Sequence, residues 1–524
     1  MAPIQKVTYT STNVDLDAFH RAFDEALTRL RASLGKTYPL YIGGKPVEGT
    51  GGGPPIVDTS PIDTSVVLGS FAAAGPVQID QAVASARAAQ KPWARLAWRD
   101  RLAILRKAAV VIRDRKFDLA ATMSLEVGKS RLEAMGDAEE SADLIDYYAQ
   151  QVEDASGFVR PMAQMTPIER NTSVLRPYGV FACIAPFNFP LALSTGMSAA
   201  ALMVGNAVVY KPALDTPLTG MALYEVYRDA GVPPGVFNFL SGHGAQMGDA
   251  LWKHPGIDGI VFTGSKQVGL RIYQGISERY VKPCLLELGG KNATIVMDSA
   301  DLDAAAEGVM RSAFSLQNQK CSATSRVYVH EAVAQPFLAA LEDKLKTIKM
   351  GDPTEKDVYF GPVINAKAVA RWEAAVDQGR KEGTILTGGA RLTGGVFDKG
   401  HFVAPTIATL PLASSLFFEE LFVPFLAVGT VSGLDEAIAE SNKAEYGLTA
   451  GFFSRKQDEI DRFFDEIEAG VCYVNKRSGA TTGAWPGAQP FTGWKGSGST
   501  GKGGCGPYYV QQFVREQSRT VIEG

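Results

Sequence analysis

The sequence predicts an α/β protein that contains two parallel-sheet units and a small β flap. Two observations predict this fold class. Short apolar segments alternate with helical segments over residues 180–276, and the alternation resumes after a Gly-Gly pair at 289–290. Strand–helix repeats of this kind form parallel sheets with right-handed crossovers. The chain of 524 residues is also too long for one ordinary core, so we expect more than one structural unit.

The part of the chain before these repeats is mostly helical. Residues 12–35 have an amphipathic helical pattern, and residues 37–47 are typical of a strand, a turn and a second strand. Residues 78–156 place apolar side chains at the helical period between charged ones, which predicts helices packed on one face. Residues 157–177 are β-prone and interrupted by turn formers, so we expect a hairpin that leaves the first unit.

The stretch 177–210 contains no charged residue and is long enough for a membrane helix. However, Pro186 and Pro190 flank Asn188 within it, and prolines at this spacing break a helix. Two buried strands on either side of a buried helix therefore fit better.

The remaining elements follow from the alternation itself. Apolar segments of strand type precede helical segments, and the boundary between the two units falls near 289–290. The expected strands are 180–186, 207–212, 236–242, 259–264, 292–297 and 325–329. The expected helices are 220–231, 244–255, 265–276, 301–316 and 333–348, and a Gly-rich stretch at 493–506 precedes a strand-like tail at 508–522.

Composition excludes several functional classes. The net charge of −4 and the pI near 5.9 give no basic surface for nucleic acid or an anionic membrane. The five cysteines show neither CxxC nor zinc-ligand spacing, and the five histidines are scattered, so we expect no metal. An odd cysteine count favours a reducing, cytoplasmic environment, and the first residues lack the apolar core of a secretory signal.

Cys321 is the strongest candidate for a catalytic residue. Lys320 precedes it and Arg326 follows, and positive charge favours the nucleophilic thiolate. Glu287 lies on a separate Gly-rich segment and can act as a general base on water. Together they predict covalent catalysis followed by hydrolysis, although a single cysteine is more often a small buried apolar residue.

Other segments suggest an oxyanion donor and a nucleotide site. Asn188 follows a buried strand, where its amide can donate to an oxyanion, although it can equally hold its own turn. The strand–turn–helix segment 261–269 is typical of phosphate binding by backbone N–H groups. Candidate cofactor-binding residues are Gly264, Ser265 and Gly269 in that segment, Lys211 at a strand end, and Glu420 and Phe422 further along. Each has a plainer alternative as a turn, surface or core residue.

The order and spacing of these residues along the chain have no such plain alternative. Asn188 and Glu287 are 99 residues apart, Glu287 and Cys321 are 34 apart, and Cys321 and Glu420 are again 99 apart. With LELGGKN at 286–292, FTGS at 262–265 and QKCSATSR at 319–326, the chain resembles the aldehyde dehydrogenase superfamily from about residue 37 to the end.

This resemblance implies a function for each part of the fold. Residues 1–156 and 178–288 would form a Rossmann-like, parallel-sheet NAD(P)-binding domain with its N-terminal helices, and 289–488 a second α/β domain, the catalytic one. Residues 157–177 and 505–524 would form an oligomerisation flap, so we expect a homodimer or a higher homo-oligomer. NAD would be the cofactor, bound by the residues named above. NADP is possible because Leu214 replaces the usual ribose-binding Glu.

Within the superfamily the chain is most similar to the branch that oxidises L-glutamate γ-semialdehyde, the open form of 1-pyrroline-5-carboxylate. The similarity lies in QKCSATSR, in TTGAWPGAQPF at 481–491 and in KGGCGPYY at 502–509. It implies that Ser322, Gly483 and Ala484 hold the substrate carboxylate, that Phe189 and Phe491 flank its methylenes, and that Lys320 lies nearby.

Two alternatives remain at this point. Trp485-Pro486 places a bulky pair in the substrate-anchoring loop, which leaves another short or carboxylated aldehyde possible. A non-catalytic structural relative is less favoured, because a structural role requires none of Cys321, Glu287 and Asn188.

Overall fold

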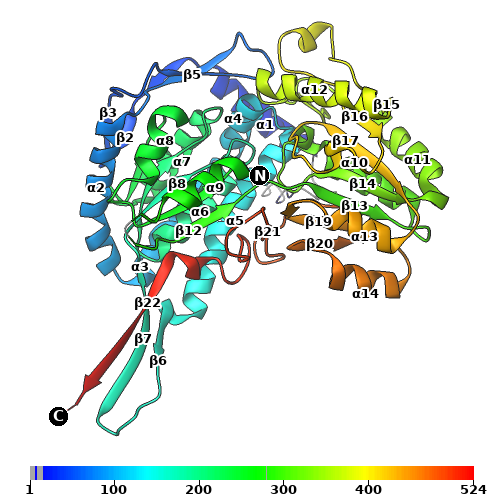
Figure 1. Ribbon diagram of the computed structural model, residues 1–524. Helices are drawn as coiled ribbons and strands as arrows, with labels where there is room; N and C mark the ends of the chain where they lie inside the picture. The colour runs from blue at the N-terminus through cyan, green and yellow to red at the C-terminus, as the bar shows by residue number, and fades with distance from the viewer. Residues whose placement is uncertain (1–5, 7, 9–15, 279, 524) are drawn as a thin grey trace.

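A computed structural model describes residues 6, 8, 16–278 and 280–523. Figure 1 shows two α/β lobes side by side, with a narrow β arm that projects from the first. The first lobe is built on a seven-stranded sheet of order β12-β11-β8-β9-β10-β2-β3. Its strands from β12 to β10 are parallel, and the β2–β3 hairpin adds two antiparallel strands at the edge. The alternation therefore produces the predicted sheet.

Helices cover both faces of this first sheet. The strands are β2 (Leu40–Ile42), β3 (Lys45–Val47), β8 (Val180–Ile184), β9 (Ala207–Lys211), β10 (Phe237–Phe239), β11 (Gly259–Thr263) and β12 (Cys284–Glu287). The helices of this lobe are α1 (Leu16–Arg31), α2 (Pro76–Arg95), α3 (Trp98–Asp114), α4 (Lys116–Val127), α5 (Arg131–Asp154), α6 (Ala192–Met203), α7 (Pro217–Ala230), α8 (Gly244–Trp252) and α9 (Lys266–Gly275). A further small sheet contains β1 (Lys36–Tyr38), β4 (Ile56–Thr59) and β5 (Val67–Phe71).

The second lobe repeats the architecture with a sheet of order β15-β16-β17-β14-β13-β19-β20, parallel except for β15. Its strands are β13 (Asn292–Val296), β14 (Thr324–His330), β15 (Thr384–Thr387), β16 (Thr406–Thr409), β17 (Phe425–Val431), β19 (Thr449–Phe453) and β20 (Val471–Val474). Its helices are α10 (Leu302–Phe314), α11 (Ala334–Lys346), α12 (Ala366–Glu382), α13 (Leu434–Asn442) and α14 (Gln457–Glu466). A small ladder joins β18 (Tyr446–Gly447) to β21 (Trp494–Lys495).

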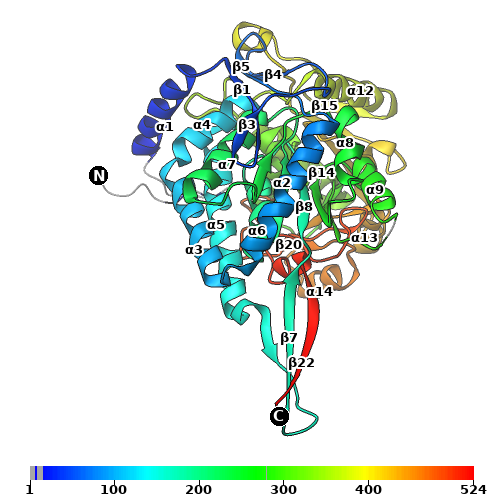
Figure 2. The same cartoon turned by 90° about the vertical axis from the view of Figure 1, so that its left-hand side faces the viewer.

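The arm is a three-stranded antiparallel sheet of order β22-β7-β6 (Figure 2). It consists of β6 (Val159–Pro161), β7 (Glu169–Pro177) and β22 (Val514–Ile522), and β22 pairs with β7 along its whole length. The hairpin and the strand-like tail predicted from sequence thus combine into one flap.

The predicted elements correspond closely to those observed. The α/β fold class is confirmed, and the uncharged stretch forms β8, α6 and β9 as expected. Strand β12 was not expected, although it ends in Glu287. The first residues of the predicted 12–35 helix lie outside the described part of the chain. Among the residues that the structure describes, we find no helix with the length and apolar character needed to cross a membrane.

Candidate active site

Four polar side chains gather at the carboxyl edge of the first sheet, where parallel α/β sheets bind ligands. Lys211 ends β9 and pairs with Ile184, the last residue of β8, four positions before Asn188. Thr263 ends β11 and pairs with Glu287, which ends β12. The sheet register therefore brings residues from four separate segments of the chain to one edge.

Cys321 comes from the second lobe, between α10 and β14. The turn before it is unusual, because Leu316, Gln317 and Asn318 all have left-handed backbone angles, with φ of 47°, 55° and 61°. The Asn318 amide stabilises this turn by donating to the carbonyls of Ala313 and Thr324, both at 2.8 Å. Asparagine tolerates such angles better than most residues, so the local sequence suits the strained turn that presents Cys321.

The Gly289–Gly290 pair allows the two lobes to meet closely at this point. A Cβ on Gly290 would lie 2.4 Å from the carbonyl oxygen of Cys321, and one on Gly289 would lie 2.1 Å from a carboxylate oxygen of Glu420. The Gly290 contact is with backbone and tolerates no side chain, whereas the Gly289 contact is with the end of the Glu420 side chain, which a Cβ would displace. Close approach rather than a turn therefore accounts for these glycines. The motif after Glu287 thus sets the position of the nucleophile segment.

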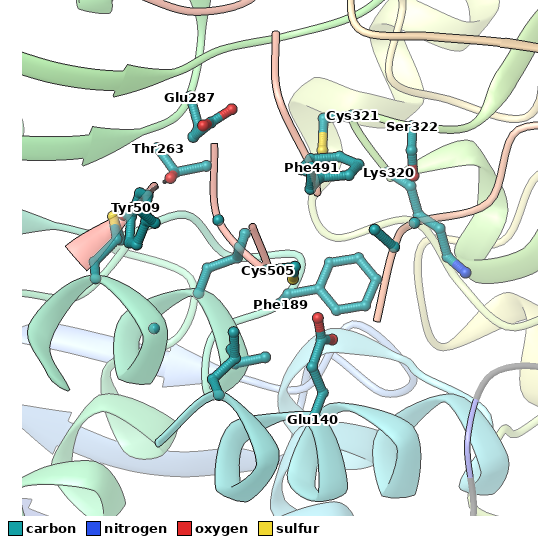
Figure 3. A pocket seen from close by; sticks show the side chains of 18 of the residues that line it. Glu140, Phe189, Thr263, Glu287, Lys320, Cys321, Ser322, Phe491, Cys505 and Tyr509 are labelled. Carbon is teal, nitrogen blue, oxygen red and sulfur yellow. Dashed lines mark hydrogen bonds between the residues drawn. The ribbon is translucent and has the colours of Figure 1, made fainter. Parts of the chain in front are cut away.

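Cys321 lies where two pockets join. One pocket, shown in Figure 3, also contains Glu287, Glu140 and the two rings of Phe189 and Phe491. The other is a long groove along the carboxyl edge of the first sheet, lined by Asn188 among others. Thr263 and Cys321 line both. A small molecule in the first pocket and a longer one in the groove can therefore both reach the same sulfur.

Burial and nearby acids dominate the electrostatic environment of Cys321. Burial, together with the negative charges of Glu420 and Glu287, raises the pKa of the Cys321 thiol to about 12. The Lys320 ammonium pairs instead with Glu133 at 2.9 Å, and the Arg326 guanidinium donates to backbone carbonyls such as that of Lys291 at 2.7 Å. Both side chains are thus engaged with other partners, and the effect of these two cations on the thiolate stays a prediction. The backbone N–H groups of Ser322 and of Cys321 itself act in the opposite direction and lower this pKa.

Glu287 has the properties of a general base. Burial raises the pKa of its carboxyl to about 8, and its Oε2 atom has no hydrogen-bond partner within the described residues. A carboxyl that titrates near neutral pH in an apolar pocket can accept a proton from water efficiently.

The residues predicted to anchor the substrate lie together. Ser322, Gly483 and Ala484 all line the Cys321 pocket. An added Cβ at Gly483 would lie 3.8 Å from the Ser322 hydroxyl, so the two positions face each other. The Trp485 indole points out of the pocket and donates to the Asp143 carboxylate at 2.9 Å. The bulky residue in the anchoring loop thus does not fill the pocket.

Two charged residues of the pocket show features that the sequence did not predict. Lys320 lines the pocket, as expected, but its ammonium is paired with Glu133 of α5. Glu140, also on α5, was not identified from sequence, and Figure 3 shows its carboxylate directed into the pocket from the side opposite Cys321. A helix with many acids gives no signal of which one faces inward.

The groove has the features of a dinucleotide site. Five of the six predicted cofactor residues line it, namely Lys211, Gly264, Ser265, Glu420 and Phe422. Ser265 is the N-cap of α9, at the helix end that binds anions, and the Gly290 N–H orients Glu420 at 2.9 Å. Burial lowers the pKa of Lys211 to about 8.

Gly269 does not line the groove. It lies inside α9, where a Cβ would meet the Leu288 side chain at 2.4 Å, so it allows α9 to pack closely on the sheet. Trp252 and Arg371 do line the groove but were not identified, because no local pattern distinguishes them from other helix residues. We find no cluster of three or more metal-ligating side chains in the described part of the chain.

Comparison with known proteins decides the family. A profile described as "Aldehyde dehydrogenase family" matches residues 48–518. The chain belongs to the aldehyde dehydrogenase family. This aldehyde dehydrogenase is 37% identical over 518 residues to the 1-pyrroline-5-carboxylate dehydrogenase 1 of Halalkalibacterium halodurans, with 98% of each chain covered.

Two solved structures are similar over nearly the whole aldehyde dehydrogenase chain. One is a 1-pyrroline-5-carboxylate dehydrogenase from Thermus with bound NAD, which has a TM-score of 0.91, 36% identity, and 100% and 99% coverage of the two chains. The other is a 3,6-anhydro-L-galactose dehydrogenase in complex with NAP, which has a TM-score of 0.86, 33% identity, and 93% and 100% coverage.

Proposed function

We propose that this aldehyde dehydrogenase oxidises L-glutamate γ-semialdehyde, the open form of 1-pyrroline-5-carboxylate, to L-glutamate with NAD as acceptor. The observation that carries the proposal is the junction of the two pockets at Cys321, with a mainly apolar pocket that holds a few charged groups on one side and a dinucleotide groove on the other. The names of full-length relatives support the same substrate and cofactor.

Each catalytic residue has a defined task in this proposal. Cys321 loses its thiol proton to solvent and its sulfur attacks the aldehyde carbon. The resulting oxyanion accepts hydrogen bonds from the Asn188 amide and the Cys321 N–H. A nicotinamide held by Glu420 and Phe422 would supply the hydride acceptor, and loss of hydride from that carbon would leave a thioester on Cys321. Glu287 then takes a proton from water, and the hydroxide so formed releases the acid.

The ends of the pocket suit an amino acid aldehyde. Ser322 and Gly483 offer a hydroxyl and a backbone N–H to the α-carboxylate, while Phe189 and Phe491 supply apolar walls for the methylenes between. The Glu140 carboxylate lies in the same pocket and matches the positive α-ammonium group. A pocket that recognises both charges would select against simple aliphatic aldehydes.

The groove residues would hold the dinucleotide. Lys211 would bind the adenosine ribose, Ser265 and Gly264 the pyrophosphate, and Glu420 the nicotinamide ribose next to Phe422. Leu214 is exposed on the surface and does not line the groove. Since position 214 offers neither a ribose acceptor nor a barrier to a 2′-phosphate, NADP is the second candidate cofactor.

Steady-state kinetics with a panel of aldehydes tests the substrate. We expect the highest kcat/KM with glutamate γ-semialdehyde and NAD, and at least tenfold less with an aliphatic aldehyde of equal length, about the cost of leaving one charged group unpaired. A higher kcat/KM with a sugar-derived or aliphatic aldehyde would favour the second candidate, oxidation of another short aldehyde. The same series with NADP decides cofactor preference, and no turnover in any combination would favour a non-catalytic role.

We also propose that the β6–β7–β22 arm joins two protomers. The arm projects from the lobe and exposes the apolar side chains of Met165, Ile168, Val521 and Ile522, and an exposed sheet edge with such side chains is typically covered by a second chain. Sedimentation at micromolar protein should show a homodimer or larger assembly, and a monomer would exclude this role.

All five cysteines are free thiols, which supports a reducing, cytoplasmic location that cell fractionation can test.

A further inference from the structure

One face of α5 carries three acids that point toward the active site. Glu133, Asp137 and Glu140 follow one another at the spacing of successive helical turns. Glu133 pairs with Lys320, and Glu140 lines the Cys321 pocket. Asp137 lies between them, is fully buried, and does not line either pocket, so the proposed chemistry assigns it no task.

Asp137 connects two parts of the chain that meet at the pocket. Its Oδ2 accepts a hydrogen bond from the Lys129 ammonium at 2.7 Å, and neither side chain has any exposed surface. Its Oδ1 accepts from the backbone N–H of Ala192 at 2.7 Å. Ala192 begins α6, four residues after Asn188, so the Asp137 carboxylate fixes the start of the helix that the oxyanion segment enters.

Lys129 contacts the pocket wall directly. Its Nζ lies 3.8 Å from the centroid of the Phe189 ring, whereas the Lys320 Nζ lies 5.7 Å from the same ring. The shorter distance is that of a close cation–π contact, and such contacts are strongest when the cation is buried, as the Lys129 ammonium is. Asp137 holds the ammonium in this place, because burial would otherwise remove its charge.

A buried ion pair is not, by itself, an efficient way to stabilise a fold. Desolvation of two charges often outweighs their attraction, and an apolar pair of similar volume is frequently as stable. The Lys129–Asp137 pair is therefore better explained by what it positions: the Phe189 ring through the ammonium, and the chain after Asn188 through the carboxylate.

We propose that Lys129 and Asp137 are positioning residues for aldehyde binding, and that Lys129 acts through the Phe189 ring. This inference rests on the proposed function, since it assigns Phe189 as the wall against the substrate methylenes. Removal of the ammonium would let the ring rotate and would loosen the aldehyde site, while the dinucleotide groove, which neither residue lines, would keep its shape.

A double-mutant cycle tests the coupling. Lys129→Met should raise the KM for the aldehyde by about tenfold or more, as expected when a binding wall is misplaced, with the KM for NAD within about twofold of wild type. Phe189→Leu keeps an apolar wall but removes the aromatic face. In the Phe189→Leu background, Lys129→Met should change kcat/KM by less than about twofold, because contacting residues that act as a unit are non-additive.

Lys116→Met is the matched control. Lys116 pairs with Glu139 at 2.7 Å and joins α4 to α5, whereas Lys129 lies in the link between these helices. The Lys116 ammonium lies 5.9 Å from the ring of Phe117, which, unlike Phe189, lines neither pocket. We expect this variant to keep the wild-type KM for the aldehyde. If Lys129→Met does not fold, the double variant Lys129→Met/Asp137→Asn takes its place in the double-mutant cycle with Phe189→Leu. It leaves no isolated buried charge, and the introduced amide oxygen still accepts a hydrogen bond from the Ala192 N–H.

The outcomes separate this inference from the proposed function. If the wild-type enzyme oxidises no amino acid aldehyde, the proposed function fails. If the wild type is active but the effects of the Lys129 and Phe189 substitutions on kcat/KM multiply independently, or if Lys116→Met raises the aldehyde KM equally, then Lys129 is merely structural and the inference is overturned.

Discussion

The backbone N–H of Gly290 donates a hydrogen bond to the Glu420 carboxylate at 2.9 Å. Glu420 lines the dinucleotide groove, and Gly290 follows Glu287 by three positions. The turn that follows the proposed general base therefore also orients a proposed cofactor ligand, and it does so across the two lobes.

Substitution of Gly289 should separate cofactor binding from folding. In Gly289→Ala the new Cβ would overlap the Glu420 carboxylate at 2.1 Å, and the end of that flexible side chain can move aside. Loss of a charged hydrogen bond costs about 1.5 kcal/mol, so we expect the KM for NAD to rise by about tenfold with little change in Tm. Gly433→Ala, with no atom within 4 Å of the added Cβ, is the control. An unchanged KM for NAD would mean that Glu420 does not bind the cofactor.

The raised pKa of Glu287 predicts how the rate of acyl-enzyme hydrolysis changes with pH. The base acts when deprotonated, so the hydrolysis rate should rise with pH and level off above its raised pKa of about 8. Single-turnover kinetics from about pH 6 to about pH 9 measures this rise in the hydrolysis rate. A rate that does not rise with pH would mean that another group is the base.

The same pKa also affects stability. Between its ordinary value of 4.5 and about 8, Glu287 binds more protons in the folded than in the unfolded chain, so its contribution to the free energy of unfolding falls as pH rises. In Glu287→Gln the side chain does not titrate, so this pH-dependent contribution to the free energy of unfolding is absent. The stability of wild type relative to Glu287→Gln should therefore decrease from about pH 5 to about pH 8, as denaturant titration at each pH can show.

Asn188 should contribute mainly to the chemical step. Loss of one oxyanion donor typically costs on the order of a hundredfold in kcat, so Asn188→Ala should lower kcat to that extent while the binding of NAD is kept. Fluorescence titration with NADH provides the binding control. A near-normal kcat would show that the amide only holds its own turn.

Much of the fold could be predicted from the sequence because its signals are local. The uncharged stretch 177–210, broken by Pro186 and Pro190, has the strand–helix–strand pattern that β8, α6 and β9 adopt. Strand β12 escaped detection because Cys284–Glu287 is only four residues long, and strands of that length give little periodicity.

The site was less predictable, because its electrostatics depend on contacts far apart in the sequence. Lys320 is adjacent to Cys321 in sequence, yet its ammonium binds Glu133, 187 residues away. The inward direction of Glu140 and the outward direction of Trp485 likewise depend on how α5 packs against the anchoring loop. Gly269 shows the converse case, since a glycine in a phosphate-binding pattern proves to serve helix packing.

Intact-protein mass spectrometry of Glu287→Gln, mixed with glutamate γ-semialdehyde and NAD, tests the central claim most directly. A stoichiometric burst of NADH should accompany a mass gain equal to one glutamyl acyl group, located on the peptide that carries Cys321 and absent from Cys321→Ala/Glu287→Gln. An NADH burst without any adduct, or an adduct on another cysteine, would contradict the account.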